Sequence, residues 1–249
     1  MIRLRNDPSR RRLLLRRGRE RVRLGPWRDS EQIAYLTPVP DAPPPSSTLI
    51  SRCIDRARKE GFSEVVTGAL AAREQPAFLA CGFELAERLH LLSHDLVDLA
   101  GPPEIASVLR RASSDDIPAV LRLDATAFDD FWRLDRAGLG EALRATPHTW
   151  FRVADHGEGA VAYAVSGVAG PRGYLQRLAV DPTHHGTGLG RALTLDGLRW
   201  MRGQGAASAL VNTQERNQGA FDLYRSVGFV AEAKGLAVLR RSVHDGDHA

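Results

Sequence analysis

The sequence predicts an α/β protein with a mixed sheet, and three observations carry this prediction. From about residue 105 onward, segments with the alternating pattern of strands are separated by segments with the period of helices. A shorter run of the same kind precedes them in residues 1–100. Hydrophobic residues make up 43% of the 249-residue chain, which is enough for a packed core. We therefore expect two domains, residues 1–100 and 105–249, with "LAGPPE" (99–104) as the linker.

The second domain is expected to alternate strands and helices up to its end. Its first helix has Ser113 or Ser114 as its N-cap, acidic residues in the first turn and Pro118 near the start. Glycine-containing turns separate the strands in the middle of the domain. The expected strands are residues 105–111, 150–155, 159–170, 173–180, 207–213 and 231–241, and the expected helices are residues 113–128, 188–203 and 217–227.

Composition narrows the class of protein. No apolar run reaches the eighteen or so residues of a membrane span, and the N-terminus lacks a signal-peptide pattern, so we expect a cytoplasmic protein without a membrane partner. Cys53 and Cys81 are the two cysteines, and neither lies in a CxxC motif. This argues against a zinc module or a disulfide scaffold, and no metal is expected.

The start of the chain is rich in arginine, with the segment "RLRNDPSRRRLLLRRGRERVR". A nucleic-acid-binding arm is one interpretation of such a run. Leu14, Val22 and Leu24 are spaced like strand residues around Gly18, so we favour a solvated hairpin. Nucleic acid remains the less favoured partner.

Three glycines at alternate positions, Gly186, Gly188 and Gly190, lie between an expected strand and an expected helix. Free backbone N–H groups at a helix N-terminus bind anions, typically phosphate. The loop is not a P-loop, because the helix opens Gly-Arg-Ala rather than Gly-Lys-Ser/Thr. It also lacks the third glycine of the dinucleotide fingerprint, at position 191 or 193.

Two segments, "LAVDPTHHGTGLGRAL" (178–193) and "NQGAFDLYRSVGF" (217–229), resemble the GCN5-related N-acetyltransferase (GNAT) family. The resemblance covers about residues 105–240, and His185 departs from the Gln or Arg usual at that position. It implies that acetyl-CoA binds with its pyrophosphate on the loop and its pantetheine along the strand. It also implies that the N–H of Leu178 or Val180 polarises the thioester carbonyl. The implied cofactor contacts are Leu178, Ala179, Val180, His185, Gly186, Thr187, Gly188, Leu189, Gly190, Arg191 and Asn217.

The same resemblance implies that Tyr224 protonates the departing thiolate, whereas the pattern alone would make it a core tyrosine on one face of the helix. The general base stays open. Related enzymes that acetylate protein N-termini have a glutamate where this chain has Asn212. Asp129, Asp130 and Glu141 are the alternative candidates.

The two domains also resemble each other. "EQPAFLACGFELAERLHLL" (74–92) aligns with residues 218–239, which puts Gly82-Phe83 opposite Gly228-Phe229 and Phe78 opposite Tyr224. "APPPSS" then stands close to where the second half has "GTGLGR". Proline lacks the N–H that would hold a pyrophosphate. We therefore predict a tandem GNAT-like arrangement whose first copy is truncated, degenerate and without a CoA loop.

The predicted function is direct transfer of an acetyl group from acetyl-CoA to a primary amine. The acceptor stays open between a protein N-terminus, a lysine and a small molecule, as does the length of the acyl group. The alternative is a non-catalytic acyl-CoA-binding sensor or interaction module with the same fold. A homodimer is a further open alternative.

Overall fold

The computed structural model describes residues 12–28, 30–155 and 159–243. These residues form two compact units. The first unit comprises the described residues up to His90 together with those from Ala233 onward, and the second unit comprises residues 91–232. Each unit is described by itself below.

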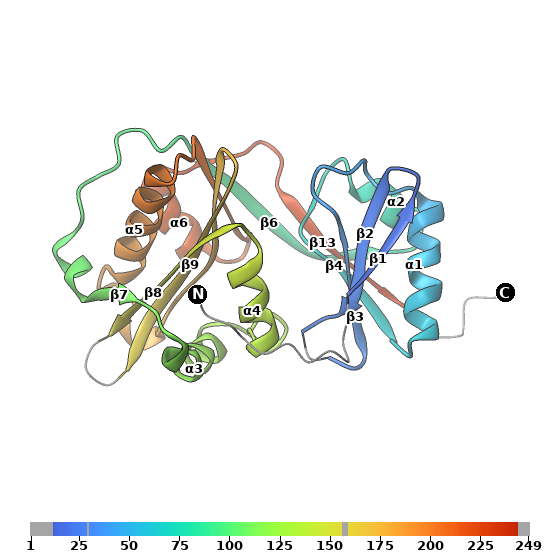
Figure 1. Cartoon of the computed structure of the whole chain (residues 1–249), viewed down its shortest axis with the longest axis horizontal. Helices are drawn as coiled ribbons and strands as arrows, with labels where there is room; N and C mark the ends of the chain where they lie inside the picture. The colour runs from blue at the N-terminus through green and yellow to red at the C-terminus, as the bar shows by residue number, and fades with distance from the viewer. Residues whose placement is uncertain (1–11, 29, 156–158, 244–249) are drawn as a thin grey trace. The chain divides into compact units, whose positions relative to one another are not determined.

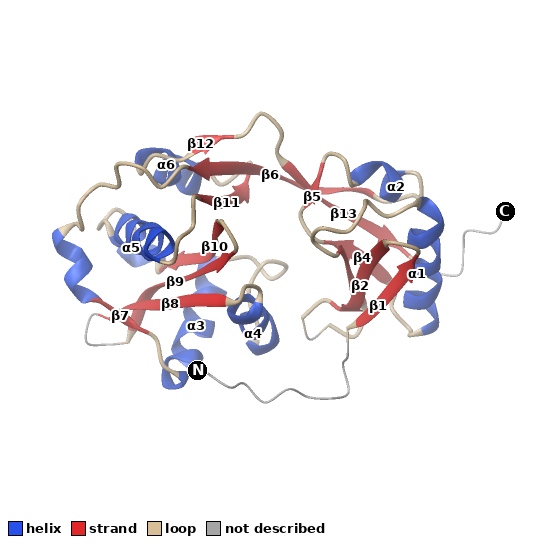
Figure 2. Cartoon of the chain, turned by 45° about the horizontal axis from the view of Figure 1, so that its top comes forward, coloured by secondary structure: helices blue, strands red, loops and turns tan. Residues whose placement is uncertain are grey.

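The second unit has a mixed sheet with helices on both faces (Figures 1 and 2). Its strand order is β6-β11-β10-β9-β8-β7, and β12 pairs with β6. Three 3₁₀ turns, Glu104–Val108, Ser114–Asp116 and Pro182–His184, lie in its connections. The elements are β7 (Leu109–Arg111), α3 (Ile117–Ala127), α4 (Arg136–Arg144), β8 (His148–Asp155), β9 (Ala160–Ala169), β10 (Arg172–Val180), α5 (Leu189–Gly203), β11 (Ser208–Gln214), α6 (Gln218–Ser226) and β12 (Val230–Ala231).

Each face of this sheet has its own apolar core. On one face α5 and α6 pack on the strands, with Leu193, Leu198 and Phe229 almost completely buried. On the other face α3 and α4 cover β8, β9 and the end of β10, with Val120 and Leu139 at the centre. The sheet therefore fixes the N-terminus of α5 and the whole of α6 on the same side.

In the first unit, the described helices and strands share a single apolar core. The side chains of α1 and α2 pack with those of β2, β3, β4 and β13 around Leu36, Ile50 and Phe78. Its strand order is β1-β2-β3-β4-β13-β6, and β5 pairs with β13. The elements are β1 (Leu13–Arg17), β2 (Glu20–Pro26), β3 (Ile33–Pro38), α1 (Ser47–Lys59), β4 (Glu64–Thr67), β5 (Leu70–Ala71), α2 (Gln75–Leu79), β6 (Glu84–His94) and β13 (Leu236–Ser242).

Over the described residues the chain crosses between the units twice, once within β6 and once between β12 and β13. Residues 84–89 of β6 pair with β13 in the first unit, whereas Leu92 and Ser93 pair with β12 in the second. The last strand, β13, belongs to the first unit. In the first unit, β13 from the end of the chain therefore pairs with β6, the strand that follows the short helix α2. In the second unit, the end of β6 pairs with β12, the strand that follows the short helix α6.

This exchange changes the expected organisation. The units do not follow a division at residues 100–105, because the crossings fall near residues 90 and 232. The single strand expected over 231–241 is two strands, β12 and β13, in different units. The strand expected over 105–111 is a 3₁₀ turn followed by the short β7. The helix after Ser113 is confirmed, with Ser113 and Asp116 forming a capping box.

The aligned helix–Gly–Phe segments have the same backbone hydrogen bonds. Phe83 N–H donates to the carbonyl of Phe78, and Phe229 N–H donates to that of Tyr224. Gly82 and Gly228 both have positive φ, +75° and +102°. Glycine takes this left-handed conformation without a steric cost, so both helices end in the same way.

Candidate functional site

Strands β10 and β11 separate part-way along their length. They pair in parallel only from Arg172 opposite Ser208 to Tyr174 opposite Leu210. Residues 175–180 of β10 continue along β9 on the other side. Among the described residues, one edge of β10 therefore has no strand partner over its second half.

The hydrogen-bond alternation decides which main-chain groups face that edge. Asp181 N–H donates to the carbonyl of Val161, which makes Ala179 a hydrogen-bonded partner of Tyr163 in the same antiparallel ladder. Leu178 and Val180 consequently direct their N–H and C=O groups away from β9, toward the open edge. Ala179 is one of the three strand residues expected to contact the cofactor. Its main-chain groups pair with β9, and its side chain is buried on the face of the sheet that α3 covers.

The glycine loop presents unpaired donors directly after this strand. Among the described residues, no acceptor takes the N–H of any residue from 186 to 191; the first helical bond runs from Ala192 N–H to the carbonyl of Gly188. Gly186 and Gly188 have φ values of +77° and +90°, which turn these amides toward the helix N-terminus. This concentration of donors at the positive end of α5 suits an anion such as a pyrophosphate.

Two side chains of the loop are held by the protein itself. His185 Nε2 lies 3.2 Å from the carbonyl oxygen of Val180, so the ring folds back over the end of β10. The Arg191 guanidinium donates to the carbonyl of Ser226 at 2.8 Å, at the C-terminus of α6. Arg191 therefore joins α5 to α6, and its main-chain N–H is the group left for a ligand.

Other residues of the loop have structural roles as well. The Thr187 hydroxyl donates to the carbonyl of His184 at 2.7 Å. A Cβ on Gly190 would lie 3.1 Å from Leu223 Cδ2, so Gly190 lets α5 approach α6 closely. Asn217 caps α6 with its side chain, as its sequence position predicts.

Tyr224 lies on the buried face of α6 and is 5% exposed. Within the described ranges its phenol has no hydrogen-bond partner. Burial raises the pKa of Tyr224 above its usual value, and the charge of nearby Arg177 opposes this effect. The phenol thus stays protonated at neutral pH and has its O–H available to donate.

The candidate bases are placed less favourably. Asp129 forms an ion pair with Arg216 at 2.9 Å, and Asp130 forms one with Arg133 at 3.0 Å. Asn212 is an exposed residue of β11 and has no titrating group. The structure brings no unpaired carboxylate among these residues to the open edge of β10.

A buried ion pair that sequence reasoning missed lies next to this site. Asp124 in α3 is fully buried and accepts two hydrogen bonds from the Arg177 guanidinium, at 2.7 and 2.8 Å. The Tyr163 hydroxyl donates to the same carboxylate at 2.5 Å, and Arg177 also donates to the carbonyl of Trp132. One feature of the sequence could have indicated this ion pair: Asp124 is a charged residue on the apolar stripe of α3, one turn after Val120.

The described residues of the first unit do not form an equivalent opening. Strands β3 and β4 stay paired from Ile33 to Leu36, and Gly68 N–H donates to the carbonyl of Leu36 beyond that. At the start of α1, the carboxylate of Glu20 accepts both the N–H and the hydroxyl of Ser46, at 3.0 and 2.8 Å. These hydrogen bonds lower the pKa of Glu20, so a carboxylate of the chain itself stays charged at this helix N-terminus.

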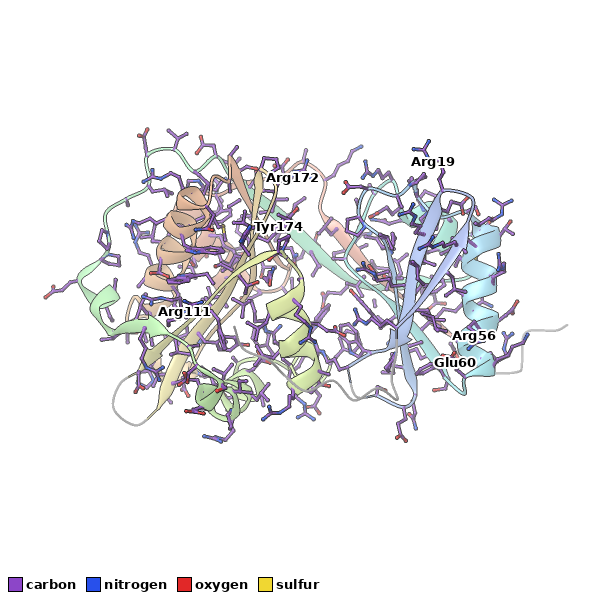
Figure 3. The ribbon with its side chains drawn as sticks, viewed as in Figure 1. Arg19, Arg56, Glu60, Arg111, Arg172 and Tyr174 are labelled. Carbon is purple, nitrogen blue, oxygen red and sulfur yellow. The ribbon has the colours of Figure 1, made fainter. Side chains whose placement is uncertain are left out.

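The arginine-rich start forms a hairpin over its described part. β1 and β2 pair with Leu15 opposite Val22 on the buried face and Arg16 opposite Arg21 on the exposed one. Arg19 lies at the turn (Figure 3). This agrees with the hairpin interpretation.

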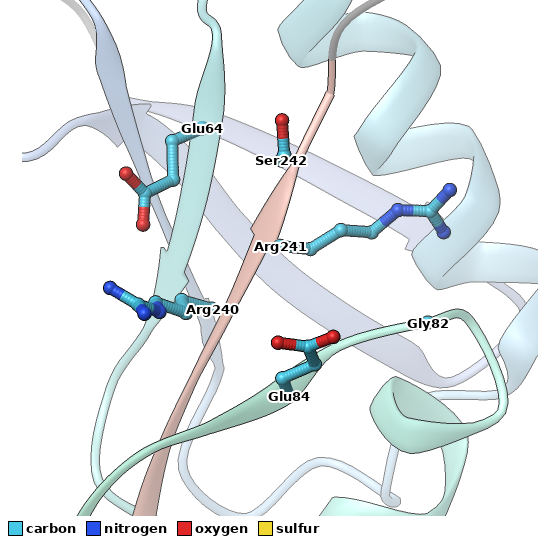
Figure 4. A pocket seen from close by; sticks show the side chains of 6 residues that line it. All are labelled: Glu64, Gly82, Glu84, Arg240, Arg241 and Ser242. Carbon is cyan, nitrogen blue, oxygen red and sulfur yellow. The ribbon is translucent and has the colours of Figure 1, made fainter. Parts of the chain in front are cut away.

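A pocket of about 420 Å³ in the first unit is lined by strand residues, among them Glu64, Glu84 and Arg240 (Figure 4). Arg240 stands opposite Glu84 in the ladder, so this is a charged groove on the sheet. It does not include any predicted site residue.

Over the part of the chain that is described, no cluster of three or more His, Cys, Asp or Glu side chains is arranged to hold a metal ion. None of the helices in these ranges combines the length and hydropathy needed to cross a membrane.

Comparison with known proteins relates the segment that holds this geometry to a family. The sequence model of the acetyltransferase (GNAT) family matches residues 111–229. This part of the chain is therefore similar in sequence to the GNAT family. The matched range holds the open edge of β10, the glycine loop and Tyr224.

Relatives in sequence are also named acetyltransferases. A mycothiol acetyltransferase from Thermobispora bispora is 29% identical over 229 residues, covering 81% of this chain and 78% of the relative. One from Segniliparus rotundus is 44% identical over 68 residues, covering 27% of this chain and 26% of the relative. Together with the GNAT domain, these names support N-acetyltransferase activity.

Solved structures agree on the fold. A GCN5-related N-acetyltransferase from Kribbella flavida has a TM-score of 0.64 at 15% identity, covering 92% of this chain and 89% of its own. A tandem GNAT protein from the clavulanic acid biosynthesis pathway has a TM-score of 0.66 at 13% identity, covering 93% and 82%. At such identities the similarity concerns the fold alone.

Proposed function

We propose that the chain transfers an acetyl group from acetyl-CoA to a small-molecule amine, at one site in the second unit. The observation that carries the proposal is the separation of β10 from β11. Among the described residues, it leaves the N–H and C=O of Leu178 and the N–H of Val180 without a strand partner, close in sequence to the free amides of residues 186–191. An extended pantetheine can pair with the first set of groups while its pyrophosphate takes the second. Both sets are main-chain groups, so the proposed contact depends little on side-chain identity.

In this proposal the reaction is direct. The acceptor amine attacks the thioester carbonyl, whose developing negative charge is stabilised by a main-chain N–H at the open edge of β10. The C–S bond breaks, Tyr224 donates its proton to the thiolate, and solvent returns a proton to the phenol. The attacking amine loses its proton to water, because Asn212 cannot accept one.

The choice of a small-molecule acceptor rests on the relatives, which are named mycothiol acetyltransferases. It is consistent with the neutral polar residues of the strands at this site. Asn212 is exposed on β11, and Gln176 on β10 has an amide oxygen without a partner among the described residues. Amide side chains donate and accept hydrogen bonds and therefore suit an uncharged polar ligand.

A second candidate function is acyl-CoA binding without turnover. Asn212 in place of a base, and the ion pairs that engage Asp129 and Asp130, favour it. The two functions separate in one assay. Release of free thiol from acetyl-CoA, measured against a pool of small amines and a pool of peptides, requires turnover, whereas calorimetric binding does not.

The main test is Tyr224→Phe, which keeps the ring and removes the proton donor. We expect kcat to fall about 10–1,000-fold, with little change in CoA affinity. Tyr35→Phe in the first unit is the matched control and should leave kcat unchanged. Full activity of the Tyr224→Phe protein would return Tyr224 to a packing role.

We further propose that the first unit is a degenerate copy without a CoA site. Pro43, Pro44 and Pro45 lack N–H groups, and the carboxylate of Glu20 already occupies the donors of Ser46. Calorimetric titration of the whole chain should give one acetyl-CoA per chain. A second site would contradict this proposal.

A further inference from the structure

The end of β6 is fixed by a histidine with two hydrogen bonds. His94 is 7% exposed, and its Nδ1 accepts the N–H of Leu96 at 2.8 Å. Because Nδ1 is an acceptor, the ring hydrogen is on Nε2. Nε2 lies 3.1 Å from the carbonyl oxygen of Val227 and donates to it. Leu96 has a φ of +61°, a strained conformation for leucine that this hydrogen bond helps to hold.

The acceptor of this second hydrogen bond is at the C-terminus of α6. Val227 is the C-cap of that nine-residue helix, whose last carbonyls have no partner further along the helix. The His94 ring also packs edge-on against Phe229 at 5.3 Å, and Phe229 packs against Tyr224 at 5.7 Å. A side chain on the intervening Gly228 would collide with the imidazole, since its Cβ would lie 2.8 Å from Nε2.

The first unit repeats this arrangement with a different residue. Arg241, on the exchanged strand β13, donates from Nη1 to the carbonyl of Cys81. Cys81 precedes Gly82 as Val227 precedes Gly228. In both units, therefore, a side chain from the exchanged strand caps the carbonyl before the glycine that ends the short helix.

We propose that His94 is a positioning residue for Tyr224. It joins the strand that enters from the first half of the chain to the end of α6, and through Phe229 it fixes the ring of Tyr224, the proposed acid. The inference rests on the proposed function for its kinetic consequence, but the positioning itself can be measured without turnover. Arg241 makes the equivalent contact at the end of α2, where Phe78 stands in the position of Tyr224. Arg241 therefore serves as the matched control.

The first experiment is NMR of protein labelled with ¹³Cζ-tyrosine, in which the four tyrosines give four signals. His94→Phe keeps a ring of similar size and removes both hydrogen bonds. We expect it to move the Tyr224 signal, assigned with Tyr224→Phe. His94→Gln, which can still donate and accept, should return the signal toward its original position. Arg241→Met should leave it unmoved. An unmoved Tyr224 signal in folded His94→Phe overturns the inference.

Kinetics give the second readout. His94→Phe should lower kcat about tenfold while KM for acetyl-CoA changes less than about twofold, because a misplaced acid affects the chemical step more than donor binding. Arg241→Met should leave both constants unchanged even if it lowers Tm. A moved Tyr224 signal with unchanged kcat supports the positioning and contradicts Tyr224 as the acid. Equal losses of kcat in the His94→Phe and Arg241→Met proteins overturn the positioning role.

A third test uses the unaltered protein, so it does not require any variant to fold. The ¹⁵N signals of His94 should be those of a neutral ring with hydrogen on Nε2 and a bare Nδ1. The opposite tautomer would remove both hydrogen bonds described above and overturn the inference.

Discussion

Replacing Asp124 by asparagine tests the buried ion pair beside the proposed site. The carboxylate is fully buried and receives donors from Arg177, from the Tyr163 hydroxyl and from Leu134 N–H. Asparagine has nearly the same shape, so the substitution removes the charge and one acceptor without opening a cavity. In either orientation of the asparagine amide, its NH₂ group would face an N–H donor that the carboxylate had accepted.

The expected magnitude follows from the burial of the partner. The Arg177 side chain is only 12% exposed, so it would keep its charge in the interior without a counter-charge. Removing one member of a buried pair typically costs about 3–5 kcal/mol. At roughly 2–4 °C per kcal/mol for a protein of this size, Tm should fall by about 6–20 °C. The loss should extend to the segment around Trp132, whose carbonyl accepts a hydrogen bond from Arg177.

Urea unfolding followed by tryptophan fluorescence is a suitable assay. Trp132, Trp150 and Trp200 are three of the four tryptophans and lie in the second unit, so the signal reports mainly on that unit. Asp130→Asn is the control, since its carboxylate is 91% exposed and its surface pair with Arg133 is worth about 0–1 kcal/mol. If Asp124→Asn costs no more free energy of unfolding than this control, the ion pair does not stabilise the fold as argued.

Two further predictions concern the loop and acid stability. Gly188→Val and Gly190→Val should both weaken acetyl-CoA binding in calorimetry, and Gly190→Val should also lower Tm because its Cβ meets Leu223; unchanged affinity in both would refute the anion site. Hydrogen bonds from Arg110 lower the pKa of Asp116 to about 2. The ionised carboxylate therefore stabilises the fold at pH values above its unfolded pKa of about 3.9, and this stabilisation is lost as the pH falls toward 2. Asp116→Asn should therefore cost at most about 3 kcal/mol at pH 6 and less at pH 3, measured by urea unfolding at both pH values; a pH-independent difference would contradict the assignment.

The sequence alone determined the parts of this protein that depend on neighbouring residues. The capped helix after Ser113, the turn at Gly228 and the glycine loop before α5 follow from caps and positive φ values that single residues impose. The α/β fold class followed from these local signals, and the segments 178–193 and 217–229 carried the resemblance to the GNAT family, whose sequence model matches residues 111–229. The roles of Tyr224 and the loop in catalysis and binding stay predictions.

Only the tertiary structure decided which strands pair and where pairing stops. The period-2 pattern of a strand states that one face is buried but does not name its neighbour, so the crossing of β6 and β13 between the units was not predicted. The separation of β10 from β11 after Tyr174 is likewise a property of two distant segments. Asp124 is a charge on an apolar stripe, and its partner Arg177 lies 53 residues away in the sequence. Burial brings such residues together across long separations, and for that reason local patterns do not specify the pair.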